Sequence, residues 1–218
     1  MVGSIIYPVT THLIETVRVQ NGTTPLWQLH LARLNRSCSA VGRAFPTLVP
    51  PHGGPDRVVR YEIMGDGVRV EERDVGPVRS QRLITARAHH KPYPHKTNDR
   101  GCFDKAGLEA AHARADDAVL LTPEGWVAEG TIWSLCWWEM GVLCGPALEL
   151  GILPGVGRSR VIQLRRHMVE RKVTRRALTG VSVFLVNAAR GVVEVESWDG
   201  DSVPKSAETA RLAAQFWP

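Results

Sequence analysis

The sequence predicts an α+β chain of two domains, a small α+β domain over residues 1–80 and a larger, β-rich domain over residues 81–218. Three observations support this prediction. An amphipathic helix follows the first strand-like run, a hairpin pattern closes the first part, and several short apolar runs separated by turns fill the second part. A chain of 218 residues is long enough for two such domains, each with its own core.

The first strand is predicted at Leu13 to Val19, which is rich in β-forming residues and is followed by the turn signal Asn21-Gly22. Thr24-Pro25 is expected to open a helix, because proline suits the first helical position. Apolar residues then recur at spacings of 4, 3, 4 and 3, so they share one helix face: Trp27, Leu31, Leu34, Cys38 and Val41.

A Pro- and Gly-rich loop is expected from Phe45 to Asp56, and a hairpin from Arg57 to Asp74 around Gly65-Asp66-Gly67. The second domain is predicted to alternate strands and helices. The expected strands are 83–88, 118–122, 126–128, 133–138 and 181–186, and the expected helices are 104–115 and 158–171.

Composition and charge exclude several classes of protein. The chain has 27 basic and 22 acidic residues, a net charge of only +5, so we expect no nucleic-acid partner; its densest basic segment, Arg158 to Arg176, is interpreted as one solvated helix face. No run approaches the roughly 20 apolar residues of a membrane span, and residues 1–10 do not resemble a secretory signal. We therefore expect a soluble, cytoplasmic protein.

The four cysteines, Cys38, Cys102, Cys136 and Cys144, form no C-x-x-C pair and are expected to be reduced thiols. His89, His90 and His95 lie close together, but no carboxylate or cysteine stands at ligand spacing, so no metal site is predicted.

Two cationic residues are candidates for chemistry. Arg33, in His30-Leu31-Ala32-Arg33-Leu34, lies beside the apolar stripe of its helix, where a planar cation can bind a phosphate or carboxylate; a surface arginine is the alternative. Lys96 lies in a constrained segment between His95 and Arg100. A lysine, with an ordinary pKa of about 10.4, becomes a nucleophile near neutral pH when it is desolvated or placed near other cations.

Two further segments carry glycine beside a polar or helical element. Glu129-Gly130-Thr131 places a carboxylate at the end of a predicted strand, where it can face a ligand or simply form a turn. In Ile152-Leu153-Pro154-Gly155-Val156-Gly157-Arg158 a Gly-rich turn leads into a helix N-terminus, whose free N–H groups can hold a phosphate.

The order and spacing of these segments resemble the class IV, pyridoxal-phosphate-dependent aminotransferases of fold type IV. The resemblance runs from about Ile14 to Val195 and includes H-x-x-R-L, Lys96 before a threonine, E-G-T and I-L-P-G-x-x-R. Shorter matches are Leu13 to Arg18, Phe103 to Ala106 and Asn187 to Gly191. The resemblance implies a D-amino-acid-aminotransferase-like fold with the cofactor between the two domains, and a homodimer.

The resemblance also implies residue roles. Lys96 would form the Schiff base with pyridoxal 5'-phosphate and move protons, and Glu129 would pair with the pyridine nitrogen. Arg33 would clamp the phosphate, with the backbone N–H groups of Val156 and Gly157 completing its binding site. Arg190 is a candidate for the carboxylate of a small amino substrate, with a surface arginine as the alternative.

Within the family, Thr16 and the segments 96–106 and 188–191 look like aminodeoxychorismate lyases, which release 4-aminobenzoate and pyruvate from 4-amino-4-deoxychorismate in folate synthesis. Thr16 would then orient or protonate the leaving oxygen. Branched-chain or D-amino-acid transamination is the alternative, and a relative that has lost its cofactor is a third reading.

Three departures from the family pattern stand out: Gly157 replaces a usual threonine, Trp133-Ser134 replaces Ser-Asn, and the segment after Phe45 is short.

Overall fold

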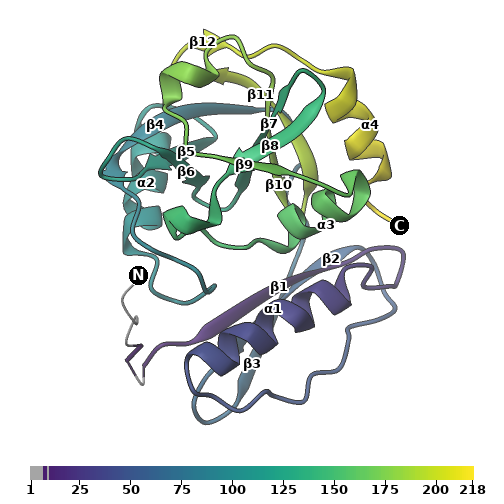
Figure 1. Cartoon of the computed structure of the whole chain (residues 1–218). Coiled ribbons are helices and arrows are strands. Elements are labelled where there is room, and N and C mark those ends of the chain that lie inside the picture. Colours follow the sequence, from purple (N-terminus) through teal and green to yellow (C-terminus); the bar gives the residue numbers. More distant parts are fainter. Residues whose placement is uncertain (1–6, 9) are drawn as a thin grey trace. The chain divides into compact units, whose positions relative to one another are not determined.

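The computed structural model describes residues 7, 8 and 10–218, which form two compact units (Figure 1). The first unit contains the chain up to Val75 together with His95–Asp99, and the second contains Gly76–Pro94 and Arg100–Pro218. The chain therefore leaves the first unit, returns to it for five residues and leaves it again. Each unit is described separately below.

The first unit is a three-stranded antiparallel sheet with one helix packed on it. Its strands are β1 (Leu13–Val19), β2 (Arg57–Ile63) and β3 (Val68–Arg73), in that order, and its helix is α1 (Trp27–Ala40). The predicted strand, helix and hairpin are thus confirmed, with the helix beginning two residues after Pro25. Because side chains alternate across a strand, Leu13, Val17 and Val19 of β1 all face the apolar stripe of α1.

The segment His95–Asp99 runs along the free edge of β1. The backbone N–H of Ile14 donates to the carbonyl of Lys96 at 2.8 Å, and Leu13 forms an isolated bridge with Thr97. The His12 N–H donates to Asn98 Oδ1 at 2.8 Å, just beyond this bridge. Backbone pairing therefore fixes the position of Lys96 relative to β1.

The second unit is built on a mixed nine-stranded sheet. Its strands are β4 (Gln81–His89), β5 (Asp117–Leu121), β6 (Val127–Gly130), β7 (Ser134–Glu139), β8 (Val142–Pro146), β9 (Val169–Arg171), β10 (Val183–Asn187), β11 (Gly191–Trp198) and β12 (Asp201–Ser202). The order is β6-β5-β4-β11-β10-β7-β8-β9, with β12 beside β11. The Val127 N–H donates to the carbonyl of Val173 at 2.8 Å, so β6 meets the chain that follows β9 and the sheet curls back on itself.

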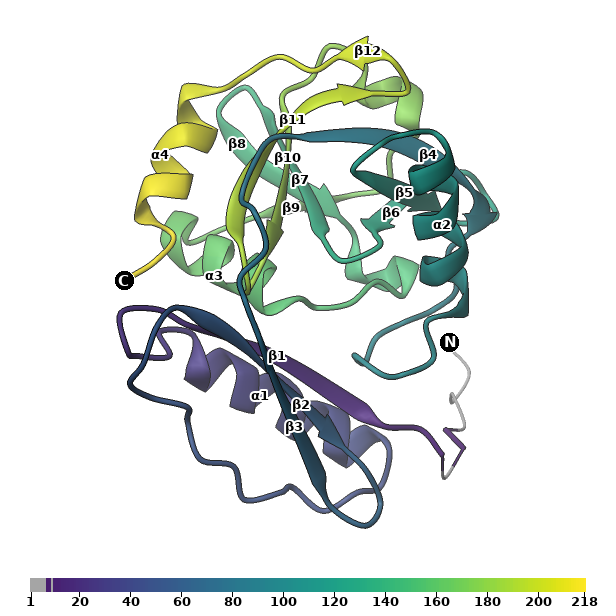
Figure 2. The same cartoon turned by 180° about the vertical axis from the view of Figure 1, so that it is seen from behind.

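Helices cover the outside of this curled sheet (Figure 2). Helix α2 (Gly101–His112) packs on β4 and β5, α3 (Val156–Arg165) on β10 and α4 (Ala207–Gln215) on β11. One apolar core contains residues of the central strands, among them Leu135, Trp137, Leu185 and Trp198. A second lies under α2 and contains Phe103, Ala106 and Leu120. Because neighbours on a strand point to opposite faces, Trp137 lies in this core while Trp138 donates from Nε1 to Thr209 of α4 at 2.8 Å.

The prediction of one solvated basic helix from Arg158 to Arg171 is wrong. Helix α3 ends at Arg165 because Arg166 adopts a left-handed conformation with φ of 64°, and the chain turns into β9. Arg158 is buried and pairs with Glu170 at 2.7 Å, so it belongs to the interior of the unit rather than to a solvated face. Sequence periodicity could not show the left-handed residue that ends this helix.

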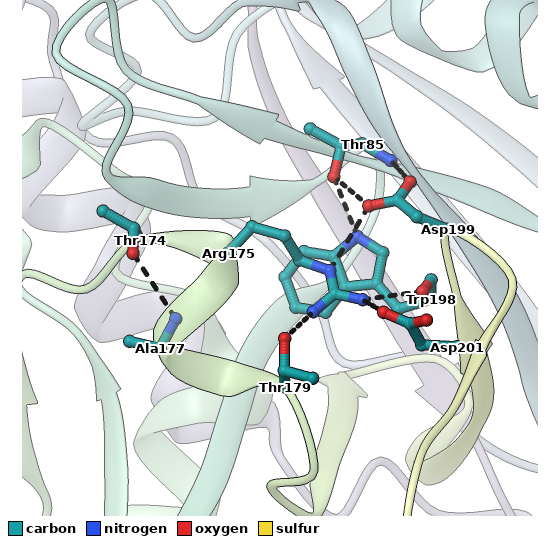
Figure 3. A network of polar contacts seen from close by, with 8 residues as sticks. All are labelled: Thr85, Thr174, Arg175, Ala177, Thr179, Trp198, Asp199 and Asp201. Atoms are coloured by element: carbon teal, nitrogen blue, oxygen red, sulfur yellow. Dashed lines mark hydrogen bonds and ion pairs between the residues drawn. The ribbon is translucent and has the colours of Figure 1, made fainter.

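Arg175 joins three parts of the second unit through one polar network (Figure 3). Its guanidinium lies over the ring of Trp198, 4.5 Å from the centroid, and donates to the Trp198 carbonyl at 2.7 Å and to Asp201 at 3.0 Å. It also donates to Asp199, whose carboxylate accepts hydrogen bonds from the N–H and the hydroxyl of Thr85. The network ties the turn between β11 and β12 to β4 and to the short 3-10 helix Arg175–Leu178.

Candidate active site

In the first unit, a buried cluster of charged and polar side chains links β1 to α1. Glu15 of β1 accepts a hydrogen bond from Arg33 Nε at 2.9 Å and one from Arg33 Nη2, and its Oε2 lies 2.6 Å from His30 Nδ1. All three residues are at most 5% exposed. Arg33 is thus a buried ion-pair partner, which corrects the alternative of a surface arginine. Among the described residues, its Nη1 makes no hydrogen bond, so this nitrogen stays available for a ligand.

The cluster has a definite charge state. Burial alone would raise the pKa of Glu15, but the Arg33 guanidinium and the His30 hydrogen bond outweigh it and lower that pKa from 4.5 to about 2. Burial lowers the pKa of His30. The hydrogen bond and charge of Glu15 oppose this shift, and the charges of Arg33 and Lys96 add to it, so the pKa stays below its ordinary value. Glu15 is therefore ionised, and neutral His30 donates to it from Nδ1.

This assignment leaves His30 Nε2 as an acceptor. The atom is buried and has no hydrogen-bond partner among the residues that the structure describes. A buried polar atom without a partner costs free energy, so it is found mainly where another requirement holds the group in place. Lys96 lies close enough for its charge to act on this imidazole. The ion pair of Glu15 and Arg33 lies at the same turn of α1, because Arg33 follows His30 by three residues.

Thr16 lies on β1 between Glu15 and Val17, opposite Arg60 of β2. By strand alternation its side chain faces away from α1, on the surface shared with Ile14 and Arg18. Thr16 is partly exposed, and within the described part of the chain its hydroxyl has no hydrogen-bond partner.

In the second unit, the carboxylate of Glu129 is held inside the sheet at the end of β6. Glu129 is 5% exposed, and its Oε1 lies 2.9 Å from His90 Nε2 and accepts a hydrogen bond from the backbone N–H of Leu153 at 3.1 Å. Oε2 makes no hydrogen bond to any described residue. A buried carboxylate with one engaged and one free oxygen is suited to a cationic N–H of a ligand.

Asp117, a residue that sequence reasoning missed, explains the Gly-Thr that follows Glu129. Its Oδ1 accepts a hydrogen bond from the Thr131 hydroxyl at 2.5 Å, and its Oδ2 accepts one from the Thr131 N–H at 3.1 Å. A Cβ at Gly130 would lie 2.8 Å from Asp117 Oδ2. Asp117 therefore requires glycine at 130 and anchors the turn after β6. Burial raises the pKa of the Asp117 carboxyl, and these hydrogen bonds oppose that shift.

Helix α3 presents an open N-terminus beside this carboxylate. Gly155 is its N-cap, and no side chain in the described part of the chain caps it. The first N–H groups of a helix have no partner inside the helix, so those of Val156 and Gly157 remain free to bind an anion. Leu153, which donates to Glu129, lies two residues before Gly155. A Cβ at Gly155 would meet the Ser134 hydroxyl at 2.7 Å, so Ser134 lies at the same helix end.

Gly157 is fixed by packing against Asn187. A Cβ at this position would lie 2.8 Å from both Cα and C of Asn187, closer than real Cβ atoms approach backbone. The structure therefore gives a physical reason for the absence of threonine here: the backbone of Asn187 occupies the space that its side chain would need.

We expect Gly157→Thr to lower the free energy of unfolding by about 1–3 kcal/mol, as overpacking does, measured by chemical denaturation. Gly107→Ala, on the open side of α2 with nothing within 4 Å of the added Cβ, is the matched control and should stabilise by about 0.5–1 kcal/mol. Equal stability of Gly157→Thr and the unsubstituted protein would contradict the packing argument.

Arg190 follows a turn that Asn187 organises. Asn187 Oδ1 accepts hydrogen bonds from the N–H groups of Ala189 and Arg190, at 3.0 and 2.8 Å. The Arg190 guanidinium lies 5.8 Å from the ring centroid of Trp133. It also packs against Gly76, where a Cβ would lie 2.8 Å from Nη2.

The predicted site residues thus fall into two groups. Lys96, Arg33 and Thr16 belong to the first unit, and the second holds Glu129, Val156, Gly157 and Arg190. Glu129 and the N-terminus of α3 are brought together through Leu153. Lys96 and Arg33 both lie close enough to His30 for their charges to lower its pKa. Sequence reasoning missed the partners Glu15, His90 and Asp117; the strand alternation of Glu15 with Leu13 and Val17 was the one available signal.

A family model described as amino-transferase class IV matches residues 69–198, more than half of the chain. The chain belongs to the class IV aminotransferase family. It therefore has fold type IV and is an enzyme of a family whose cofactor is pyridoxal 5'-phosphate. The residues present fit this cofactor, since the second unit offers a buried carboxylate oxygen without a partner and an uncapped helix N-terminus close to it.

Relatives of different activity resemble this class IV chain. A protein of Methanocaldococcus jannaschii named "Putative branched-chain-amino-acid aminotransferase" is 34% identical over 100 residues, which are 44% of this chain and 35% of that protein. The chain therefore matches only about a third of the length of that relative.

Solved structures share the fold over nearly the whole chain. The branched-chain aminotransferase of Thermoproteus uzoniensis has a TM-score of 0.85 at 20% identity, with 98% of this chain and 89% of that chain covered. A "Putative 4-amino-4-deoxychorismate lyase" of Legionella pneumophila has a TM-score of 0.78 at 22% identity, covering 94% and 91%. Proteins named for both activities share this architecture, so the fold alone does not select between the two.

No helix in the described part of the class IV chain is both long and apolar enough to cross a membrane.

Proposed function

We propose that this class IV enzyme is a lyase that converts 4-amino-4-deoxychorismate to 4-aminobenzoate and pyruvate. The observation that carries the proposal is Thr16, whose partly exposed hydroxyl has no partner among the described residues and lies on the face of β1 that is turned away from α1. A hydroxyl placed there can donate a proton to a leaving ether oxygen. Transamination needs no such donor, because no carbon–oxygen bond breaks.

The proposed chemistry divides between the two units. Lys96 would hold the cofactor aldehyde through its amine, and its free amine would remove the proton at the ring carbon of the substrate that bears nitrogen. Glu129 would hold the pyridine N–H through Oε2. Arg33 Nη1 and the N–H groups of Val156 and Gly157 would bind the phosphate. The bound cofactor supplies an electron sink for the carbanion that proton removal creates.

The bond between the ring carbon and the ether oxygen would then break, the enolpyruvyl group would leave as the enol of pyruvate, and the ring would become aromatic. Thr16 would protonate or orient the leaving oxygen. Arg190 is proposed to bind a substrate carboxylate, as the family resemblance implies. We also propose the domains 1–80 and 81–218 with the cofactor between them, a homodimer and a cytoplasmic location. The cofactor position and the homodimer follow from the family resemblance, whereas the domain division and the location follow from the sequence pattern and composition.

The proposal is tested by incubating the purified protein with 4-amino-4-deoxychorismate and, separately, with an amino acid plus a 2-oxo acid. Release of 4-aminobenzoate that needs no 2-oxo acid is the expected result. Thr16→Val should lower this release about 10²-fold, and Thr16→Ser should restore most of it, because the serine hydroxyl replaces the lost donor. Amino-group transfer without aminobenzoate would reject the lyase.

A branched-chain aminotransferase is the second candidate. The 34% identity to the protein of Methanocaldococcus jannaschii supports it. In that case Lys96 would move a proton between the substrate Cα and the cofactor, and Thr16→Val would leave the rate within a few-fold of its original value.

A further inference from the structure

The second unit contains a buried histidine that the proposed chemistry does not use. His90 is 3% exposed and follows β4, and its Nε2 lies 2.9 Å from Oε1 of Glu129, which is 5% exposed. The two residues are 39 positions apart in the sequence, so only the fold brings them together.

The imidazole of His90 is held on several sides. The backbone N–H of His90 donates to the carbonyl of Leu121 at 2.8 Å, which fixes the chain at the end of β5. The ring of Phe103 meets the imidazole edge to face, with centroids 6.0 Å apart. Phe103 in turn packs against Tyr93 at 4.9 Å in the core under α2. The imidazole is therefore part of a packed core and not a side chain that rotates freely.

The hydrogen bonds determine which group donates. The N–H of Leu153 can only donate, and it donates to the same Oε1 that His90 contacts, so this oxygen is an acceptor. His90 Nε2 must then carry the proton in its contact with a carboxylate. Any form of the imidazole with a proton at Nε2 meets this requirement.

We propose that His90 is a positioning residue, which holds Glu129 by Oε1 so that Oε2, with its negative charge, is directed to the ring nitrogen of the cofactor. The proposal rests on the role of Glu129 given above. Without the His90 bond, the carboxylate would keep only the Leu153 N–H and would be free to turn about its terminal torsion.

Two substitutions separate this role from simple packing. His90→Gln keeps an N–H donor that can reach the position of Nε2, and His90→Leu fills similar space without a donor. Hydrogen bonds to charged groups are strong, so we expect His90→Leu to weaken cofactor binding about tenfold or more and His90→Gln to restore most of it. Binding is followed by titrating the visible absorption of the cofactor on the full-length protein.

A second readout needs no cofactor. Nitrogen-15 spectra of the cofactor-free protein with labelled histidine, assigned by the signal missing in His90→Gln, should show His90 protonated at Nε2. In Glu129→Ala this resonance should shift. A signal protonated at Nδ1 alone, or His90→Leu and His90→Gln binding cofactor equally well, would overturn the proposal.

The result is distinguishable from failure of the proposed function. If cofactor absorption does not depend on Lys96, the cofactor assignment itself is wrong, whatever His90 does. If it depends on Lys96 and Glu129→Gln binds cofactor as tightly as the unsubstituted protein, the role of Glu129 is wrong. If both dependences hold and the His90 variants behave alike, the positioning role of His90 alone is rejected.

Discussion

Lys96→Ala is expected to remove the visible absorption band of the cofactor-loaded protein and to lower turnover by about 10⁴-fold or more. In the proposed mechanism the lysine both binds the cofactor covalently and moves the substrate proton, and a positioned acid or base alone contributes up to about 10⁴-fold. Absorption spectra and the initial rate of 4-aminobenzoate release measure the two effects separately.

The matched control is Lys105→Ala, which removes an exposed lysine of α2. This variant should keep both the band and the rate. The alanine variant keeps the Lys96 carbonyl, so the backbone pairing with Ile14 is preserved, and circular dichroism checks that the variant is folded. A folded Lys96→Ala protein that still shows the band would overturn the assignment of Lys96.

Glu15→Gln is expected to lower the free energy of unfolding by about 3–5 kcal/mol at neutral pH. The substitution removes the carboxylate that compensates buried Arg33, and an uncompensated buried charge is strongly destabilising. Chemical denaturation measures the change. Adding Arg33→Met to this variant should recover part of the loss, because the unpaired charge is then gone.

The effect of Glu15 depends on pH in a defined direction. Its pKa is lowered from 4.5 to about 2 in the folded protein, so the folded state holds the proton less tightly than the unfolded state. The resulting stabilisation, about 3 kcal/mol for a shift of this size, is fully present above about pH 5 and is lost as the pH falls toward 2. The difference between the unsubstituted protein and Glu15→Gln should shrink over this interval.

An exposed ion pair provides the control for Glu15. Lys172 and Glu149 pair at 2.9 Å with side chains 45% and 64% exposed. Glu149→Gln should change stability by no more than about 1 kcal/mol. Equal losses in Glu149→Gln and Glu15→Gln would show that burial of the Glu15 cluster contributes nothing.

The sequence predicted the elements whose side-chain period is unambiguous. Strand β1, helix α1 and the hairpin of β2 and β3 lie where periodicity and turn residues placed them. Helix α3 is shorter than predicted, because a single left-handed residue, Arg166, ends it without a glycine or proline signal. Strand β9 is three residues long and pairs with β8, so its periodicity is too short to recognise.

Prediction of the candidate site depended on segments that carry a local signature. Lys96, Glu129 and the Gly-rich turn before α3 each lie inside a short sequence motif. The partners of these residues are not: His90 reaches Glu129 across 39 residues, and Asp117 reaches Thr131 across 14. His90 was considered only as a metal ligand, because a hydrogen-bond partner distant in sequence leaves no spacing pattern.

The return of His95–Asp99 to the first unit makes that unit discontinuous in the chain. A fragment that stops at Val75 would lack the segment that covers the outer edge of β1, including the bond from Ile14 to Lys96. The first unit cannot be moved into another protein as one continuous segment, and a single crossover cannot exchange it with the corresponding unit of a relative. A chimera of two such proteins would need three junctions, and Lys96 would have to come from the same parent as the N-terminal part.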